Sequence, residues 1–335
     1  MKLTRYLYEK SYVEYSLLIS LLERDSEKSL FWAYELYFSG FKTQVFSLIW
    51  KYYYLLYGCF HVRLERYMKK KTEQWLNNKK NYIILGTIVF NMSTREPCID
   101  SYLMMQNIIE FPNILTEWTA KLNNAENPIS VLEDFINKYN CYKTKGKHLF
   151  NVTKETIEDI HIIENETIQY ACIARMMSGL FLLDNMNNLD GKLYLKLNEK
   201  YCRKYETKPL IEFKSWKIPE NNCLFHQYVP PNKDLIPIQC LQDWINYCWY
   251  TPLWKKRIQR YNGQLYNNKI YFEDEDDEEK FYNFCNLEPD EQTLDVLQKW
   301  YGTKIFDSWQ QIHDKYYFED IHNWFETRLE TVLQF

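Results

Sequence analysis

Glycine and proline are scarce in this chain of 335 residues, which contains 8 Gly and 10 Pro. Together they make up about 5% of the residues, whereas an average protein contains about 12%. This scarcity excludes collagen-like, linker-like and proline-rich disordered chains, and it leaves few residues for the tight turns of a β-sandwich or barrel. Apolar and charged residues, at 46% and 26%, are in the ordinary range for a folded protein. The composition therefore predicts a helix-rich fold.

Familiar catalytic and cofactor motifs are absent as well. The sequence has no G-x-x-x-x-G-K, G-x-G-x-x-G, H-E-x-x-H or G-x-S-x-G pattern. Its six histidines form no recognisable constellation, and His313 and His322 would lie on nearly opposite sides of a predicted helix. The sequence therefore predicts a protein that is not an enzyme and holds no cofactor. An enzyme with an unrecognised site is the alternative.

The nine cysteines are scattered, odd in number and without a C-x-x-C pair. This pattern is typical of reduced thiols in a cytosol-like compartment and not of a disulfide framework. Four potential zinc ligands follow one another at Cys223, His226, Cys240 and Cys248, but structural zinc sites pair their ligands more closely than Cys240 and Cys248. We therefore predict buried thiols and no metal site, with this zinc set as the alternative.

Long apolar runs are missing too. The longest uncharged stretch, residues 81–94, lies between Lys80 and Arg95 and is fourteen residues long. Because a membrane-spanning helix needs about 20 apolar residues, this stretch predicts a core helix and no membrane segment.

Apolar residues at helical spacing predict a series of helices in the first half of the chain. Gly40 and Gly58 are expected in the left-handed conformation that ends a helix, and short links predict antiparallel neighbours. The fold class is therefore mainly α, with stacked antiparallel helices, helical-repeat or solenoid-like, over residues 1–190. The predicted helices cover residues 13–23, 26–39, 43–57, 62–77, 82–92, 130–139 and 167–183, with caps at Ser11 with Glu14, Asp25 or Ser26, Thr43, and Ser130 with Glu133.

The second half has a different pattern and is predicted to form a mixed domain over residues 191–335. Strict alternation over 192–197, and weaker alternation over 211–214, predicts two short strands. Residues 265–266 and 270–272 are further strand candidates, with Asn267 and Asn268 at turn positions. Helices are predicted again over 292–300 and 306–333, and the domain boundary is placed near residues 185–191.

The net charge of −4 conceals a segregation of charge. The run 273–279 contributes seven negative charges, so the rest of the chain sums to +3. A run of like charges repels itself and cannot pack, so the sequence predicts a solvated acidic loop here.

Two basic clusters are candidates for nucleic-acid binding, with RNA as the candidate ligand. Tyr67 and Trp75 interleave with the first cluster, and aromatic rings with cations are what single-stranded nucleic acid uses. The alternatives are solvated helix faces with buried aromatics, or contact with an acidic protein. The predicted nucleic-acid-binding residues are Arg63, Arg66, Lys69, Lys70 and Lys71 in the first cluster, and Lys255, Lys256 and Arg257 in the second.

Two segments, S-L-F-W-A-Y-E-L-Y-F-S-G-F at 29–41 and L-E-P-D-E-Q at 287–292, resemble a family of uncharacterised proteins from the giant nucleocytoplasmic DNA viruses. The resemblance implies a viral protein made in the host cytoplasm and brings no known catalytic residues. A helix over 29–41 would be apolar nearly all round, so we expect it to lie between two neighbours. If Glu35 is buried there, it needs a basic side chain or a tyrosine hydroxyl as its partner.

The segment 12–18 matches a Tyr-x-x-x-x-Leu-hydrophobic pattern. It resembles the helical motif by which translation-initiation scaffolds bind the mRNA cap-binding protein, a helix-in-groove mode of recognition. Such scaffolds also hold an RNA helicase. The leading interpretation is therefore a non-enzymatic interaction scaffold that binds a cap-binding protein through Tyr12, Leu17 and Leu18. In the packing alternative, Leu17 and Leu18 face the protein's own core, and the alternative function is a minor virion or genome-associated protein.

Overall fold

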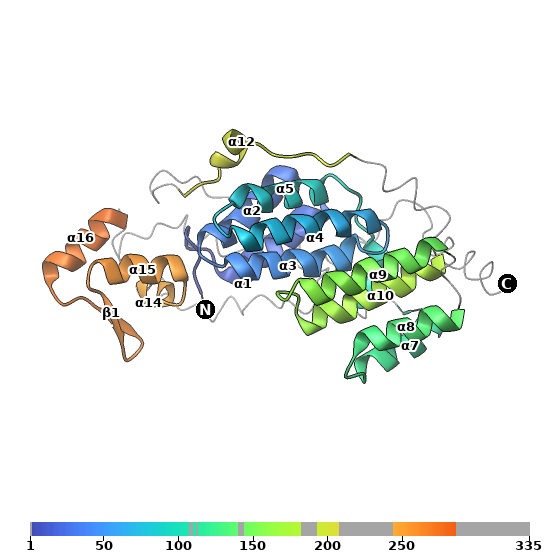
Figure 1. Ribbon diagram of the computed structural model, residues 1–335. Coiled ribbons are helices and arrows are strands. Elements are labelled where there is room, and N and C mark those ends of the chain that lie inside the picture. The colour runs from blue at the N-terminus through green and yellow to red at the C-terminus, as the bar shows by residue number, and fades with distance from the viewer. Residues whose placement is uncertain are drawn as a thin grey trace, which may run out of the picture. The chain divides into compact units, whose positions relative to one another are not determined.

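The computed structural model describes residues 2–106, 110–111, 113–139, 144–181, 193–207 and 244–285. These residues form fourteen helices and one two-stranded sheet (Figure 1), so the mainly α fold with a small β element in the second half is confirmed. The helices are α1 (Lys10–Leu22), α2 (Ser26–Phe38), α3 (Lys42–Leu56), α4 (Val62–Asn77), α5 (Tyr82–Ser93), α6 (Ile99–Met105), α7 (Asn113–Asn123), α8 (Pro128–Tyr139), α9 (Thr144–Asp159), α10 (Asn165–Phe181), α12 (Glu199–Arg203), α14 (Trp244–Cys248), α15 (Pro252–Arg260) and α16 (Glu275–Cys285). The strands are β1 (Gln264–Tyr266) and β2 (Lys269–Tyr271).

The chain divides into two compact units, one of residues 1–45 and 197–313 and one of residues 46–196 and 314–335. This division does not follow the expected boundary near 185–191. The N-terminus explains the difference: the Thr251 hydroxyl donates to the Leu3 carbonyl at 2.6 Å, and the Trp254 indole donates to the Thr4 carbonyl at 2.9 Å. These bonds attach the start of the chain to α15 in the first unit.

In the first unit, α1 packs against α2, and every residue from Ser29 to Tyr37 is buried. These residues are thus covered on all sides, which agrees with the expectation that the helix lies between two neighbours. Glu35 is fully buried, and its carboxylate accepts from Arg5 Nε at 2.7 Å and from the Tyr6 amide at 3.0 Å. Arg5 also donates to the Tyr205 carbonyl at 2.8 Å. The predicted basic partner of Glu35 is thus present.

Helix ends agree with the predicted caps at two places. Asp25 caps α2 by accepting from the Lys28 amide at 3.0 Å, and Gly40 follows α2 with a φ of 99°. The expectation of a left-handed conformation at Gly58 is wrong. Gly58 has no positive φ; a Cβ there would lie 3.3 Å from Ala174 Cβ, so the residue allows α10 to approach closely.

The predicted caps at Ser11, Thr43 and Ser130 are also wrong. Helices α1, α3 and α8 begin at Lys10, Lys42 and Pro128, so all three residues lie inside their helices. At α8 the start is shifted because a residue upstream of Ser130 caps the helix. The Asn127 side chain accepts from the Ile129 amide there at 3.1 Å.

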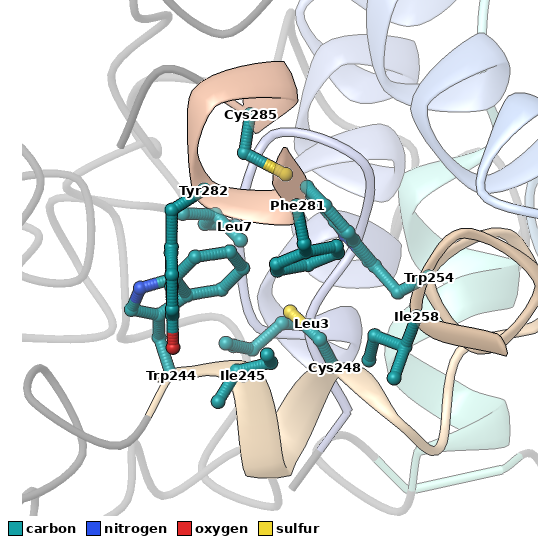
Figure 2. Packing of buried hydrophobic residues seen from close by; sticks show 10 residues of the cluster. All are labelled: Leu3, Leu7, Trp244, Ile245, Cys248, Trp254, Ile258, Phe281, Tyr282 and Cys285. Carbon is teal, nitrogen blue, oxygen red and sulfur yellow. The ribbon is translucent and has the colours of Figure 1, made fainter. Parts of the chain in front are cut away.

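A separate core of the first unit gathers α14, α15, α16 and the N-terminal segment (Figure 2). Figure 2 shows the Phe281 ring in the middle of the cluster, and Trp244 stacks on it at 6.2 Å between ring centroids. Aromatic and sulfur side chains make up the larger part of this core, and aliphatic side chains fill the rest. Its buried residues are Leu3, Leu7, Trp244, Ile245, Cys248, Trp254, Ile258, Phe281, Tyr282 and Cys285.

The hairpin of β1 and β2 confirms one predicted pair of strands. Tyr266 pairs with Lys269, and the two turn residues Asn267 and Asn268 have φ angles of 48° and 62°. Two successive positive φ angles are the mark of a type I′ turn, which suits the twist of a two-residue hairpin and which Asn tolerates.

Two other predictions for the second half are wrong. Residues 193–197 form no strand, because they have no partner strand and hydrogen-bond to a side chain of α5. The acidic run is solvated as expected, but its second part is the first turn of α16 and not a loop. Negative side chains are stabilised at a helix N-terminus, where the free amides carry partial positive charge.

The second unit consists of packed helices from α3 to α10. Its α4 begins and ends where the sequence predicted, and α5 does so within one residue. Helix α10 contacts α6, α7, α8 and α9, and α4 contacts α5 and α9. Figure 1 shows α9 lying along α10, and α7 along α8. Helices α6, α7 and α9 were not predicted.

Some predictions lie outside the described residues: the strand at 211–214, the helices at 292–300 and 306–333, and all of the alternative zinc set but Cys248. Within the described ranges, every helix is too short or too polar to cross a lipid bilayer.

Candidate nucleic-acid interface

The first basic cluster lies on α4, which is strongly amphipathic. Arg63, Arg66 and Lys70 are exposed and follow one another at intervals of three or four residues, so they share one face of the helix. The opposite face carries Leu64 and Met68, both fully buried. The helix therefore presents a cationic stripe while its apolar side is in the core.

Lys69 does not belong to this stripe. Its ammonium lies 2.7 Å from the Asp159 carboxylate and 3.5 Å from that of Glu155, both on α9. Partial burial alone would lower the pKa of Lys69, but the hydrogen bond and attraction to Asp159 outweigh it and raise the pKa. Lys69 is thus neutralised by α9 and contributes to helix packing, which removes it from the predicted nucleic-acid-binding set.

A segment distant in sequence lies over α5 next to the stripe. The Leu195 amide donates to Asn91 Oδ1 at 2.9 Å, and Asn91 Nδ2 donates to the Leu195 carbonyl at 2.6 Å. One carboxamide thus binds both main-chain groups of Leu195, as a neighbouring strand would. Asn91 itself is buried, so its position is fixed by α5. Sequence reasoning missed this contact, because alternation over 192–197 indicated a strand.

Aromatic stacking holds the same segment on α4. The Tyr194 ring stacks on Tyr67 with centroids 4.1 Å apart and planes 6° from parallel, and the Arg95 guanidinium lies 4.7 Å from the Tyr194 centroid. Trp75 is fully buried and stacks on Phe46 at 3.8 Å. Both aromatics of the predicted interface therefore pack within the protein, which agrees with the alternative of buried aromatics.

The segment adds Lys196 to the cationic stripe. Burial and the nearby charges of Lys196 and Lys70 lower the pKa of Lys71. The positive charges of Lys70 and Lys196 therefore lie close enough to Lys71 to repel it. No ion pair among the described residues involves Lys70, Lys71 or Lys196. We call Arg63, Arg66, Lys70, Lys71 and Lys196 the α4 basic surface.

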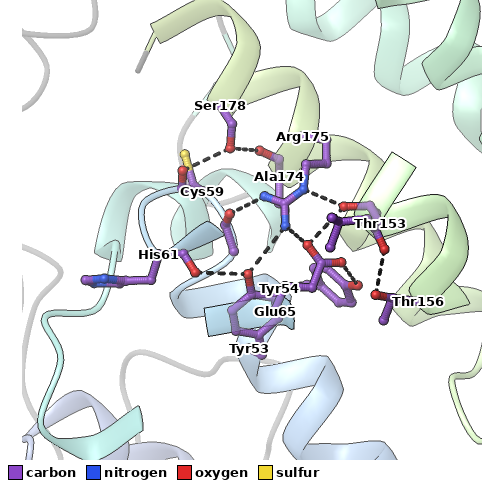
Figure 3. Close-up of polar contacts among 12 residues, drawn as sticks. Tyr53, Tyr54, Cys59, His61, Glu65, Thr153, Thr156, Ala174, Arg175 and Ser178 are labelled. Carbon is purple, nitrogen blue, oxygen red and sulfur yellow. Dashed lines mark hydrogen bonds and ion pairs between the residues drawn. The ribbon is translucent and has the colours of Figure 1, made fainter. Parts of the chain in front are cut away.

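A buried ion pair fixes α4 on the side that faces the core (Figure 3). Arg175 of α10 pairs with Glu65 of α4, and both side chains are fully buried. The Tyr54 hydroxyl donates to Glu65 at 2.6 Å, and Thr153 of α9 donates to it at 3.0 Å. Arg175 also donates to the Gly58 carbonyl at 2.6 Å. Since each charged group has several partners, the network connects α3, α4, α9 and α10 and holds the basic surface in place.

The second predicted cluster lies on α15, in the first unit. Lys255 and Lys256 are exposed, but Arg257 is half-buried, with its guanidinium 4.7 Å from the Trp254 ring centroid. Burial lowers the pKa of Arg257. Arg257 therefore packs on Trp254, which belongs to the core shown in Figure 2, and Lys255 and Lys256 remain as the exposed residues of the three.

The predicted partner-binding residues lie on α1. Leu17 is fully buried and Leu18 is 2% exposed, whereas Tyr12 is half-buried. Both leucines are therefore part of the protein's own core, as the packing alternative states.

The described cysteines do not form a reactive site. Cys59, Cys98, Cys172, Cys202, Cys248 and Cys285 are all buried free thiols. Burial raises the pKa of Cys172 and of Cys285 to about 12, so both stay protonated at neutral pH, when thiols are poor nucleophiles and poor metal ligands. No cluster of His, Cys, Asp and Glu within the described ranges is arranged to hold a metal.

Comparisons of the chain with protein-family models, with curated proteins and with solved structures find no match.

Proposed function

We propose that the protein is a non-enzymatic interaction scaffold that contacts single-stranded RNA through the α4 basic surface. The gathering of Lys70, Lys71 and Lys196 on one surface carries this proposal, because positive charges that lie close together attract an anionic partner. RNA backbones supply a row of phosphates that such a surface can neutralise, and the release of counterions then drives binding.

The contacts proposed here are to phosphates and not to bases. Tyr67 and Tyr194 stack on each other, and Trp75 is buried, so these rings are engaged within the protein. Binding by phosphate contacts alone carries no direct sequence information. We therefore expect strong salt dependence and little preference for base sequence.

The more specific proposals for the scaffold's partners and origin are not equally supported by the structure. Burial of Leu17 and Leu18 favours packing over docking of the segment 12–18 in a cap-binding protein. A helicase partner, a giant-virus origin, a role in translation initiation and a location in the host cytoplasm stay proposals that follow from the resemblance. Among the alternatives, a genome-associated protein would use the same basic surface.

A charge-removal experiment tests the proposal. The variant with Lys70→Gln, Lys71→Gln and Lys196→Gln should bind a fluorescent 20-nucleotide RNA about a hundredfold more weakly near 0.1 M salt. The slope of log K against log salt should also fall by about 2, since each phosphate contact to a single strand contributes about 0.7. Fluorescence anisotropy at several salt concentrations measures both quantities.

A matched variant separates the surface from total charge. Lys121, Lys138 and Lys200 are exposed and lie on α7, α8 and α12, so their replacement by Gln removes three charges elsewhere. This control should leave the salt slope within about 0.5 of the wild-type value. Equal losses in both triple variants, or no RNA binding by the wild type, would refute the proposal. If only Lys255→Gln with Lys256→Gln weakened binding, the interface would be on α15.

A further inference from the structure

We infer that the exposed face of the β1–β2 hairpin binds the ammonium group of a lysine in a basic segment of a partner protein. This site lies in the first unit and is independent of the proposed RNA contact. It would give the scaffold a second, positively charged ligand beside the negatively charged RNA.

The hairpin has one buried and one exposed face. Ile270 and Leu265 point to the core side, and the Ile270 amide donates to the side chain of Asn246 on α14 at 2.7 Å. The register pairs Gln264 with Tyr271, and residues two apart share a face. Gln264, Tyr266, Lys269 and Tyr271 therefore lie together on the outward face.

Two tyrosine rings form adjoining walls on this face. Tyr266 is 67% exposed and Tyr271 51% exposed, values that are high for large aromatic side chains. Their rings are 6.2 Å apart with planes at 68°. Together with Gln264, Phe272 and Glu273 they line an open depression of about 410 Å³. Its walls are mainly aromatic, and a cation near the face of an aromatic ring is attracted by the ring's quadrupole.

A carboxylate completes the site. Glu273 lies at the edge of the depression, and the Gln264 amide donates to Glu273 Oε1 at 2.8 Å, which holds the carboxylate beside the rings. Six further acidic residues follow at 274–279, and those from Glu275 on form the start of α16. Aromatic walls with a carboxylate suit a cation, and the acidic run attracts a basic segment around that cation.

A peptide titration tests this inference. The probe is a fluorescent 11-residue peptide with one central lysine and four flanking arginines, and its matched form carries acetyl-lysine at the centre. Acetylation removes the ammonium charge and leaves the flanking charges unchanged. We expect the lysine peptide to bind about tenfold more tightly than the acetylated one. A trimethyl-lysine peptide should retain at least the affinity of the lysine form, because its charge persists.

Variants of the exposed rings locate the binding. Tyr266→Leu and Tyr271→Leu each keep an apolar side chain on a solvent-exposed face, so the circular dichroism spectrum and melting temperature should stay close to the wild-type values. Each should remove most of the tenfold preference for lysine over acetyl-lysine. Tyr250→Leu is the matched control, since Tyr250 is exposed but does not line the depression, and it should keep the preference.

Three outcomes would overturn the inference: equal binding of the lysine and acetyl-lysine peptides, no binding of either, or a preference that persists in both tyrosine variants. The last would show that the acidic run alone attracts the peptide. All readouts use a peptide ligand, so failure here leaves the RNA result unaffected.

Discussion

Replacing Arg175 with Met should lower the free energy of unfolding by about 3–5 kcal/mol, because it leaves the Glu65 carboxylate buried without its cation. The two side chains are fully buried and paired in the wild type. Tyr54 and Thr153 would still donate to the carboxylate, but two neutral donors do not replace a positive charge. Urea denaturation, followed by circular dichroism, measures the change.

A double variant distinguishes the unpaired charge from lost packing. Glu65→Leu combined with Arg175→Met removes both charges, so it should be more stable than the Arg175→Met single variant. Lys51→Gln breaks a partly exposed ion pair with Glu166 on the same unit and should cost about 1 kcal/mol or less. If Arg175→Met cost no more than Lys51→Gln, the network would not be the element that fixes α4.

The helices were predictable where local sequence decides the structure. Scarce Gly and Pro, the Asp25 cap and the apolar spacing of 62–77 indicated α2 and α4 correctly. Asn267 and Asn268 marked the hairpin because few other residues tolerate two positive φ angles in succession. The need of Glu35 for a basic partner also followed from a buried charge in an apolar helix.

Which basic residue pairs with Glu35 was not predictable, because Arg5 meets Glu35 only through tertiary packing. The candidate site shows the same limit. Lys69 and Lys70 are adjacent in sequence, yet one faces the carboxylates of α9 and the other faces solvent. Lys196 joins the α4 basic surface because Asn91 binds the main chain of Leu195 and Tyr194 stacks on Tyr67. The local sequence therefore predicts which residues share a helix face. Whether the charges on that face are neutralised depends on residues that are distant in sequence.

Replacing Leu17 with Ala should lower the free energy of unfolding by about 2–5 kcal/mol, because the side chain is fully buried and its removal leaves a cavity in the core. Leu17→Met conserves most of the volume and should cost less than about 1.5 kcal/mol. Urea denaturation of both variants measures the difference. The result bears on function, because Leu17 is also an anchor of the Tyr-x-x-x-x-Leu-hydrophobic pattern.

An anchor that docks in a partner's groove must be accessible before binding, and a core residue is not. We therefore expect Leu17→Ala to destabilise the protein and the wild type to show no capture of purified cap-binding protein. Tyr12→Ala provides the contrast within the same pattern, since Tyr12 is half-buried and its loss should destabilise the protein less than that of Leu17. Unchanged stability of Leu17→Ala, together with capture by the wild type that this variant and Tyr12→Ala both abolish, would instead establish the segment 12–18 as a docking helix.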